Sequence, residues 1–127
     1  MALQGVQFRL RSAQIQDLTL QGATLRLHWQ AYNPNTITAV LDGFEVDVYA
    51  NDQHVTRVNL DRPVEIAPHD STAFHMDVPI TWSLLGNTLT QLFRERRLEI
   101  KADGRALMKT PWGALRIPVV QKTRRIL

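Results

Sequence analysis

The four histidines are the side chains best suited to metal binding or to acid–base chemistry near neutral pH. They are His28, His54, His69 and His75. No two of them are two or four residues apart, the spacings that place metal ligands side by side on a strand or a helix. The chain has no cysteine, which excludes thiolate metal sites, disulfides and cysteine nucleophiles. We therefore predict no metal site and expect histidines on solvent-facing strand positions.

The serines and acidic residues form no catalytic pattern either. None of the three serines lies in the Gly-x-Ser-x-Gly turn that exposes a catalytic serine; they are Ser12, Ser71 and Ser83. Glu45 and Asp47 are spaced for one face of a strand. That face lacks an apolar pocket to raise a carboxyl pKa, so we interpret it as solvated. The six glycines are scattered and form no phosphate-binding loop. We predict no enzyme activity, no catalytic residue and no cofactor.

Two basic clusters could contact phosphate groups. They consist of Arg94, Arg96 and Arg97, and of Lys122, Arg124 and Arg125. Acidic residues dilute the first cluster, and we interpret the second as a solvated tail. Neither is interleaved with the aromatic side chains on which single-stranded bases stack. We therefore predict no nucleic-acid binding, and a weak nucleic-acid binder is the least favoured alternative.

Apolar and polar residues alternate with a period of two through most of the chain, which predicts strands with one buried face. The run from Ala23 to Tyr32 is unbroken. Similar runs lie at 6–11, 44–50, 54–60, 64–66, 74–80, 98–104 and 115–119. One-sided strands are typical of antiparallel sheets, so we predict an all-β antiparallel sandwich of about seven strands. Its predicted core consists of Leu25, Leu27, Trp29, Phe44, Val46, Val48, Phe74, Met76, Val78, Leu98 and Ile100.

Turn residues separate these runs. Asp42-Gly43 is predicted to be a turn before the strand at 44–50, and Asn51-Asp52 predicts a hairpin after it. Pro79 and Pro118 lie inside alternating runs, which favours edge strands or strand ends. The period changes only between Thr81 and Arg97, where apolar residues at helical spacing predict a single helix of three to four turns that covers an open end or flank.

Length and composition indicate one globular domain over residues 1–127. A chain of 127 residues with 44% hydrophobic content can bury a core without disulfides. The net charge of +3 favours solubility over nucleic-acid binding. No apolar run approaches the ~20 residues of a membrane helix, and no segment resembles a signal peptide.

Asn33-Pro34-Asn35 closes the clearest predicted strand. Pro34 lacks a backbone donor and biases Asn33 toward an extended or turn conformation. Asparagine side chains bond to local backbone, so we predict a structural stop. A ligand site is the alternative.

The order of these features resembles the WHy (water stress and hypersensitive response) domain of the group 2, or atypical, late embryogenesis abundant proteins, in its bacterial single-domain type. The resemblance rests on the strand Leu-x-Leu-x-Trp-x-Ala-Tyr-Asn-Pro-Asn at 25–35 and on the hairpin that follows it. It continues with the loop at 66–71, the strand at 74–78, the helix, and a strand that ends at Gly104.

This resemblance implies an immunoglobulin- or fibronectin-III-like sandwich with one helix. It implies a non-enzymatic role in tolerance of drying, cold or heat, in which client proteins are shielded from inactivation or aggregation. Asn33, Pro34 and Asn35 match the family signature, and the resemblance implies a structural role for them. Bacterial members often follow an export or lipoprotein signal, so we expect the periplasmic side of the cell envelope, with the cytoplasm as the alternative.

The partners that we expect are client proteins bound non-specifically by a monomer, or a membrane surface. An interaction module of the cell envelope is the alternative function. It would present either a polar sheet face, with Thr24, Arg26, His28 and Gln30, or a sheet edge for strand addition.

Overall fold

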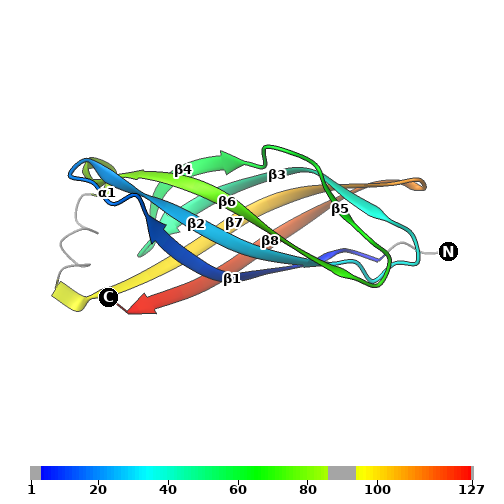
Figure 1. Cartoon of the computed structure of the whole chain (residues 1–127), viewed down its shortest axis with the longest axis horizontal. Coiled ribbons are helices and arrows are strands. Elements are labelled where there is room, and N and C mark those ends of the chain that lie inside the picture. The colour runs from blue at the N-terminus through cyan, green and yellow to red at the C-terminus, as the bar shows by residue number, and fades with distance from the viewer. Residues whose placement is uncertain (1–3, 86–93, 127) are drawn as a thin grey trace.

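The chain folds into two antiparallel sheets that pack face to face (Figure 1). This computed structural model describes residues 4–85 and 94–126. The predicted antiparallel sandwich is confirmed. Within the described residues no helix is long and apolar enough to span a membrane.

The smaller sheet has three strands in the order β1-β2-β6. They are β1 (Gln7–Gln16), β2 (Gly22–Tyr32) and β6 (Ser71–Thr81). The larger sheet has the order β4-β3-β7-β8, and β5 also pairs with β3. Its strands are β3 (Ala39–Ala50), β4 (Gln53–Asn59), β5 (Val64–Ile66), β7 (Arg97–Thr110) and β8 (Gly113–Ile126). Pro79 lies in β6 and Pro118 in β8, both edge strands, where a missing backbone donor is tolerated.

The core lies between the sheets and contains the inward-facing residues of the alternating runs. Every predicted core residue is buried except Phe74, which is half-buried and packs against the others. The Trp29 ring lies at the centre, 5.1 Å from the Phe44 ring and 6.5 Å from the Phe74 ring, measured between centroids. A Cβ atom at Gly104 would lie 2.6 Å from Phe44 Cε1, so this strand position accepts only glycine without a shift in the core.

The predicted hairpin between β3 and β4 is confirmed, and its turn has an identifiable chemistry. Asn51 and Asp52 have φ angles of 46° and 68°, as the central residues of a two-residue type I′ turn do. Asp42-Gly43, in contrast, is not a turn before the strand. It lies inside β3, where the pairing with β7 shifts register between Leu41 and Gly43. Such a shift marks a β-bulge.

The predicted helix from Thr81 to Arg97 is wrong at its C-terminal end. Helix α1 spans Trp82–Leu85, residues 86–93 of the prediction lie outside the described residues, and Arg97 is the first residue of β7. Arg96 has a φ angle of 52°, which is incompatible with a continuing right-handed helix. The second basic cluster is also corrected, because Lys122 and Arg124 belong to the backbone ladder between β8 and β7 and not to a tail.

Candidate functional site

The Asn33 side chain is fully buried where β2 ends, and each of its polar atoms has partners. Its Nδ2 donates to the backbone oxygens of Ile37 (2.8 Å) and Ile66 (3.0 Å). Its Oδ1 accepts from the backbone N and from the Nδ2 of Asn35, both at 3.0 Å. Pro34 stands between the two asparagines and turns the chain so that these contacts form.

Asn35 extends this network to the N-terminal segment and to the loop before β6. Gln4 N donates to Asn35 Oδ1 (2.8 Å), and Asn35 Nδ2 donates to Gln4 O (2.9 Å). Asn33 N donates to Asp70 O (3.0 Å), and His69 N donates to Asn35 O (3.3 Å). Both N–H groups of each side-chain amide are therefore used within the protein, and neither is left to donate to a ligand. The structural role of the motif stays a prediction.

Two of the four histidines face each other across β2 and β6. His28 and His75 are register partners, and their ring centroids are 6.4 Å apart. His54 contacts Asp47, and His69 is exposed in a loop. Spacing along the sequence could not reveal the pair because strand pairing brings distant positions together. Among the described residues, no group of three or more His, Asp or Glu side chains could hold a metal ion.

An ion-pair network covers the outer face of the larger sheet and is centred on Asp47. Arg57 donates to its two carboxylate oxygens from Nε (3.1 Å) and Nη2 (3.3 Å). His54 Nε2 lies 3.0 Å from Oδ1, and Arg105 Nη2 donates to Oδ2 at 3.1 Å. Arg105 Nη2 also bonds Glu45 Oε1 at 2.9 Å. Because these pairs cross three adjacent strands, they hold β4, β3 and β7 in one register.

The interpretation of this face as solvated is wrong for Asp47, which is buried. Hydrogen bonds from Arg57 first, and then from His54 and Arg105, hold the pKa of the Asp47 carboxyl well below its usual range. A carboxylate that stays ionised at every physiological pH cannot donate a proton as a general acid. The charged groups around it also saturate its lone pairs, so the arrangement favours structure over proton transfer.

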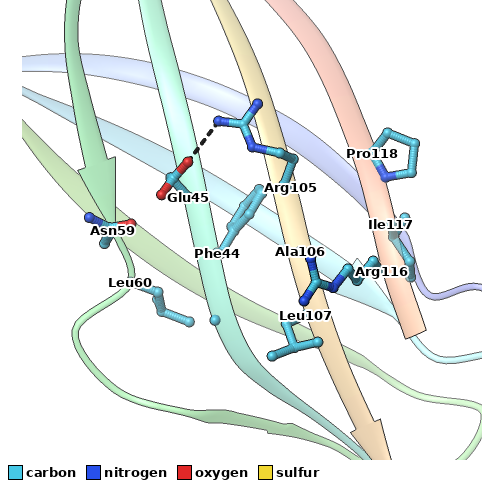
Figure 2. Close-up of a pocket in the computed structure, with 11 residues that line it drawn as sticks. Phe44, Glu45, Asn59, Leu60, Arg105, Ala106, Leu107, Arg116, Ile117 and Pro118 are labelled. Atoms are coloured by element: carbon cyan, nitrogen blue, oxygen red, sulfur yellow. Dashed lines mark hydrogen bonds and ion pairs between the residues drawn. The ribbon is translucent and has the colours of Figure 1, made fainter. Parts of the chain in front are cut away.

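A pocket of about 550 Å³ opens on the same sheet face, beside the Glu45–Arg105 pair (Figure 2). We call it the Gly43 pocket. Its lining residues come from β3, the end of β4, β7 and β8, and are Gly43, Phe44, Glu45, Asn59, Leu60, Arg105, Ala106, Leu107, Arg116, Ile117 and Pro118. Sequence reasoning missed the pocket. The signal that could have shown it is Gly43, the one position on this part of the face without a side chain.

The first basic cluster lies at the junction that precedes β7. Arg94 and Arg96 are exposed, and Arg97 Nη2 lies 3.5 Å from Glu95 Oε2. In the second cluster, Arg124 Nε donates to Glu99 Oε2 at 3.0 Å. Each cluster therefore has at least one cation paired with a carboxylate, which reduces the charge available to a phosphate backbone.

A family comparison identifies the class of protein that this fold and motif belong to. The model of the late embryogenesis abundant protein family, type LEA_2, matches residues 28–123. The match includes the end of the strand that leads into Asn33-Pro34-Asn35, both strands of the β3–β4 hairpin, and most of β8. This chain is a member of the LEA_2 family of late embryogenesis abundant proteins. The predicted resemblance is confirmed.

Solved structures of similar shape include two that were determined in solution and one crystal structure. An Arabidopsis thaliana protein solved in solution is 14% identical with a TM-score of 0.78, covering 98% of this chain and 85% of that one. A solution structure assigned to the late embryogenesis abundant proteins is 13% identical with a TM-score of 0.66, covering 97% and 71%. A protein from Archaeoglobus fulgidus is 12% identical with a TM-score of 0.65, covering 99% and 98%. At these identities the likeness shows the fold alone. None of the curated protein sequences matches this chain.

Proposed function

We propose that this protein is a non-enzymatic stress protectant that shields client proteins from inactivation or aggregation during drying, cold or heat. The observation that carries the proposal is the late embryogenesis abundant family match over residues 28–123. The proposal that it is not an enzyme draws support from the Asp47 network, in which the most buried carboxylate is held ionised by three partners.

Both outer sheet faces support a role in contact with other molecules. On the smaller sheet, Arg26 forms a two-bond pair with Asp77, with distances of 2.8 and 3.1 Å. On the larger sheet, Glu45 and Asp47 are paired with arginines. Charges that are already paired within the protein are less available to pair with one particular partner, which suits a protectant with non-specific clients.

A folded protectant must itself survive the stress that unfolds its clients. Typical domains are stable by only ~5–15 kcal/mol, so local networks that join distant segments matter. The Asn33–Asn35 network joins three segments at one end of the sandwich, and the Asp47 network joins three strands. The chain has no cysteine, so its stability does not depend on the redox state of its surroundings.

The test is protection of a labile enzyme during freeze–thaw, drying or heating. We expect equimolar or lower amounts of this protein to preserve more activity than an equal mass of serum albumin. The far-ultraviolet dichroism should show β structure in dilute buffer before any stress. Protection no better than that by albumin would overturn the proposal.

We propose that the protein acts as a monomer at the periplasmic side of the bacterial cell envelope, with the cytoplasm as the alternative. Light scattering on a sizing column should give the mass of one chain. Fractionation of the native cells, followed by immunodetection, should place the protein with periplasmic or envelope markers. Detection with cytoplasmic markers alone would favour the alternative location.

A specific observation favours an interaction module as the second candidate function. The Gly43 pocket is lined by both apolar and charged residues, and a non-specific protectant does not require such a pocket. If protection fails while a defined ligand binds the pocket, the interaction module becomes the better description.

A further inference from the structure

We propose that the Gly43 pocket binds a single-chain amphipathic anion, a small molecule with one carboxylate or phosphate head and an alkyl tail. This inference goes beyond the protectant function and does not depend on it. It rests on the shape of the pocket, on the apolar side chains in its lining and on one arginine that has no hydrogen-bond or ion-pair partner among the described residues.

The shape follows from two neighbouring cross-strand rows on the outer face. In one row, Gly43 of β3 pairs with Leu107 of β7, which pairs with Arg116 of β8. Directly opposite residues on one sheet face have neighbouring side chains. Because Gly43 has no side chain, the row has a gap over β3. The bulge between Leu41 and Gly43 places the glycine at this point, since one extra residue re-aims the side chains that follow.

The second row forms one wall of the gap. It runs from Asn59 of β4 through Glu45 and Arg105 to Pro118 of β8. Figure 2 shows the dashed contact between Glu45 and Arg105 on this side of the pocket, with Leu60 across β3 from Leu107. The resulting volume of about 550 Å³ falls in the range of ~300–1,000 Å³ typical of small-molecule sites.

Part of the lining is apolar although the surrounding sheet face is charged. Leu107 is half-buried beside the gap and Pro118 is exposed at its rim, whereas Leu60 and Ile117 line the pocket from half-buried positions that pack against the core. Covering these side chains removes apolar surface from water, which favours binding in proportion to the area covered. An alkyl chain fits this requirement.

Arg116 determines the charge of the ligand. Within the described part of the chain its guanidinium has no hydrogen bond and no ion pair, although it lines the pocket. The other arginine of the pocket, Arg105, is already engaged by Glu45 and Asp47. A free guanidinium binds a carboxylate or phosphate through two parallel N–H donors. Arg116 is therefore the group that would hold the anionic head.

The position of the pocket argues for a small molecule over an added peptide strand. It lies over β3 and β7; β7 is paired on both sides in this region, and β3 pairs with β7 at Gly43 and with β4 from Glu45 onward. The backbone groups of β7 are used by the sheet, so a peptide cannot extend the ladder over the middle of the pocket. The ligand must be held by side-chain contacts alone, which suits an alkyl chain with one charged end.

The experiment titrates the purified protein by calorimetry with four probes below their aggregation concentrations: decanoate, decyl phosphate, decanol and acetate. We expect saturable binding of decanoate and decyl phosphate at one molecule per chain. Decanol lacks the charge and acetate lacks the chain, so each should bind at least about tenfold more weakly. Absence of saturable decanoate binding, or equal binding of decanol, would overturn the proposal.

Two variants test the location of the site, and a third provides a matched control. Arg116→Gln removes the free charge and should weaken decanoate binding about tenfold or more. Gly43→Leu fills the gap; its Cβ has only one neighbour within 4 Å, Leu107 Cβ at 3.8 Å, so the fold should accept the side chain while the ligand is excluded. Lys122→Gln removes another cation from the same face of β8, away from the pocket, and should leave binding unchanged.

Dichroism and urea midpoints identify any variant that fails to fold. Decanoate binding that survives both Arg116→Gln and Gly43→Leu, or that Lys122→Gln weakens equally, would place the ligand elsewhere and overturn the assignment. A peptide that binds the pocket more tightly than decanoate would also overturn it. Protection of a labile enzyme by Arg116→Gln should equal protection by the wild type, so failure of the ligand site and failure of the protectant function give different results.

Discussion

Asn33 Oδ1 accepts two hydrogen bonds from Asn35, one from its backbone N and one from its side-chain Nδ2, each 3.0 Å long. Two buried amides separated by one proline therefore act as a unit. Asn33 faces inward to Ile37 and Ile66, and Asn35 faces the N-terminal segment at Gln4. The motif joins the end of β2 to two other parts of the chain, the N-terminal segment at Gln4 and the segment at Ile66.

Replacing these asparagines should destabilise the fold in a graded way. Asn35→Ala should lower the free energy of unfolding by about 1–2 kcal/mol, as the loss of local side-chain to backbone bonds does. Asn33→Ala should cost more, about 2–4 kcal/mol, because it leaves buried backbone oxygens without donors. Urea unfolding measures both, with Thr38→Ala at an exposed position as the control. Unchanged stability together with lost protection of a client would show that the motif is a ligand site.

Trp29 should contribute more to stability than any polar contact. Its ring is buried between Phe44 and Phe74, so Trp29→Ala should lower the free energy of unfolding by about 3–5 kcal/mol. Trp29 Nε1 is buried without a hydrogen-bond partner among the described residues. Trp29→Phe removes that unpaired donor together with part of the ring and should cost less, under about 2 kcal/mol. A loss below about 1 kcal/mol for Trp29→Ala would contradict the central position of this ring.

The Asp47 network should make stability depend on pH in the acid range. Because arginine and histidine partners lower the pKa of Asp47 in the folded state, the unfolded chain takes up its proton first as the pH falls. The stability that Asp47 contributes is therefore present above about pH 4, where an unfolded aspartate titrates. It is lost progressively on further acidification.

Urea unfolding between about pH 6 and pH 2 tests this sign. Asp47→Asn should lower stability at neutral pH and flatten the loss on acidification. Arg26 also lowers the pKa of Asp77, which should account for part of the slope that remains. Asp61→Asn, at an exposed loop position, should keep the wild-type slope. A slope that is the same in Asp47→Asn and in the wild type would exclude the network as its source.

The first basic cluster should not bind nucleic acid. Arg97 is close to Glu95, and the exposed Arg94 and Arg96 are too few to release many counterions from a phosphate backbone. Gel shifts with single- and double-stranded DNA and RNA at physiological salt should show only weak non-specific contact. Replacing the three arginines with glutamine should leave protection intact. Sub-micromolar binding that falls with salt and disappears in this triple variant would favour the nucleic-acid alternative.

The alternation of residue types determined the strands and the core, because it is a local property of the chain. A strand that places Leu25, Leu27 and Trp29 on one face can bury that face in only one register, since a slip of one residue would bury arginine and histidine. The hairpin at Asn51-Asp52 could also be predicted from local sequence, because the residues of the turn themselves favour positive φ. The C-terminal end of the helix was predicted wrongly, because the spacing of apolar residues does not show that Arg97 begins a strand.

Only the tertiary structure decided which side chains meet, because that depends on strand order and on bulges that no short pattern encodes. A plain two-residue hairpin would place Thr56 opposite Asp47. The register shift between Val48 and Tyr49 places Arg57 there instead, and this pairing buries and ionises the carboxylate. The bulge at Gly43 likewise opens the pocket beside Arg116, on a strand that is distant in sequence but second neighbour in the sheet. Alternation specifies which face a residue occupies, whereas its neighbours on that face are set by long-range pairing.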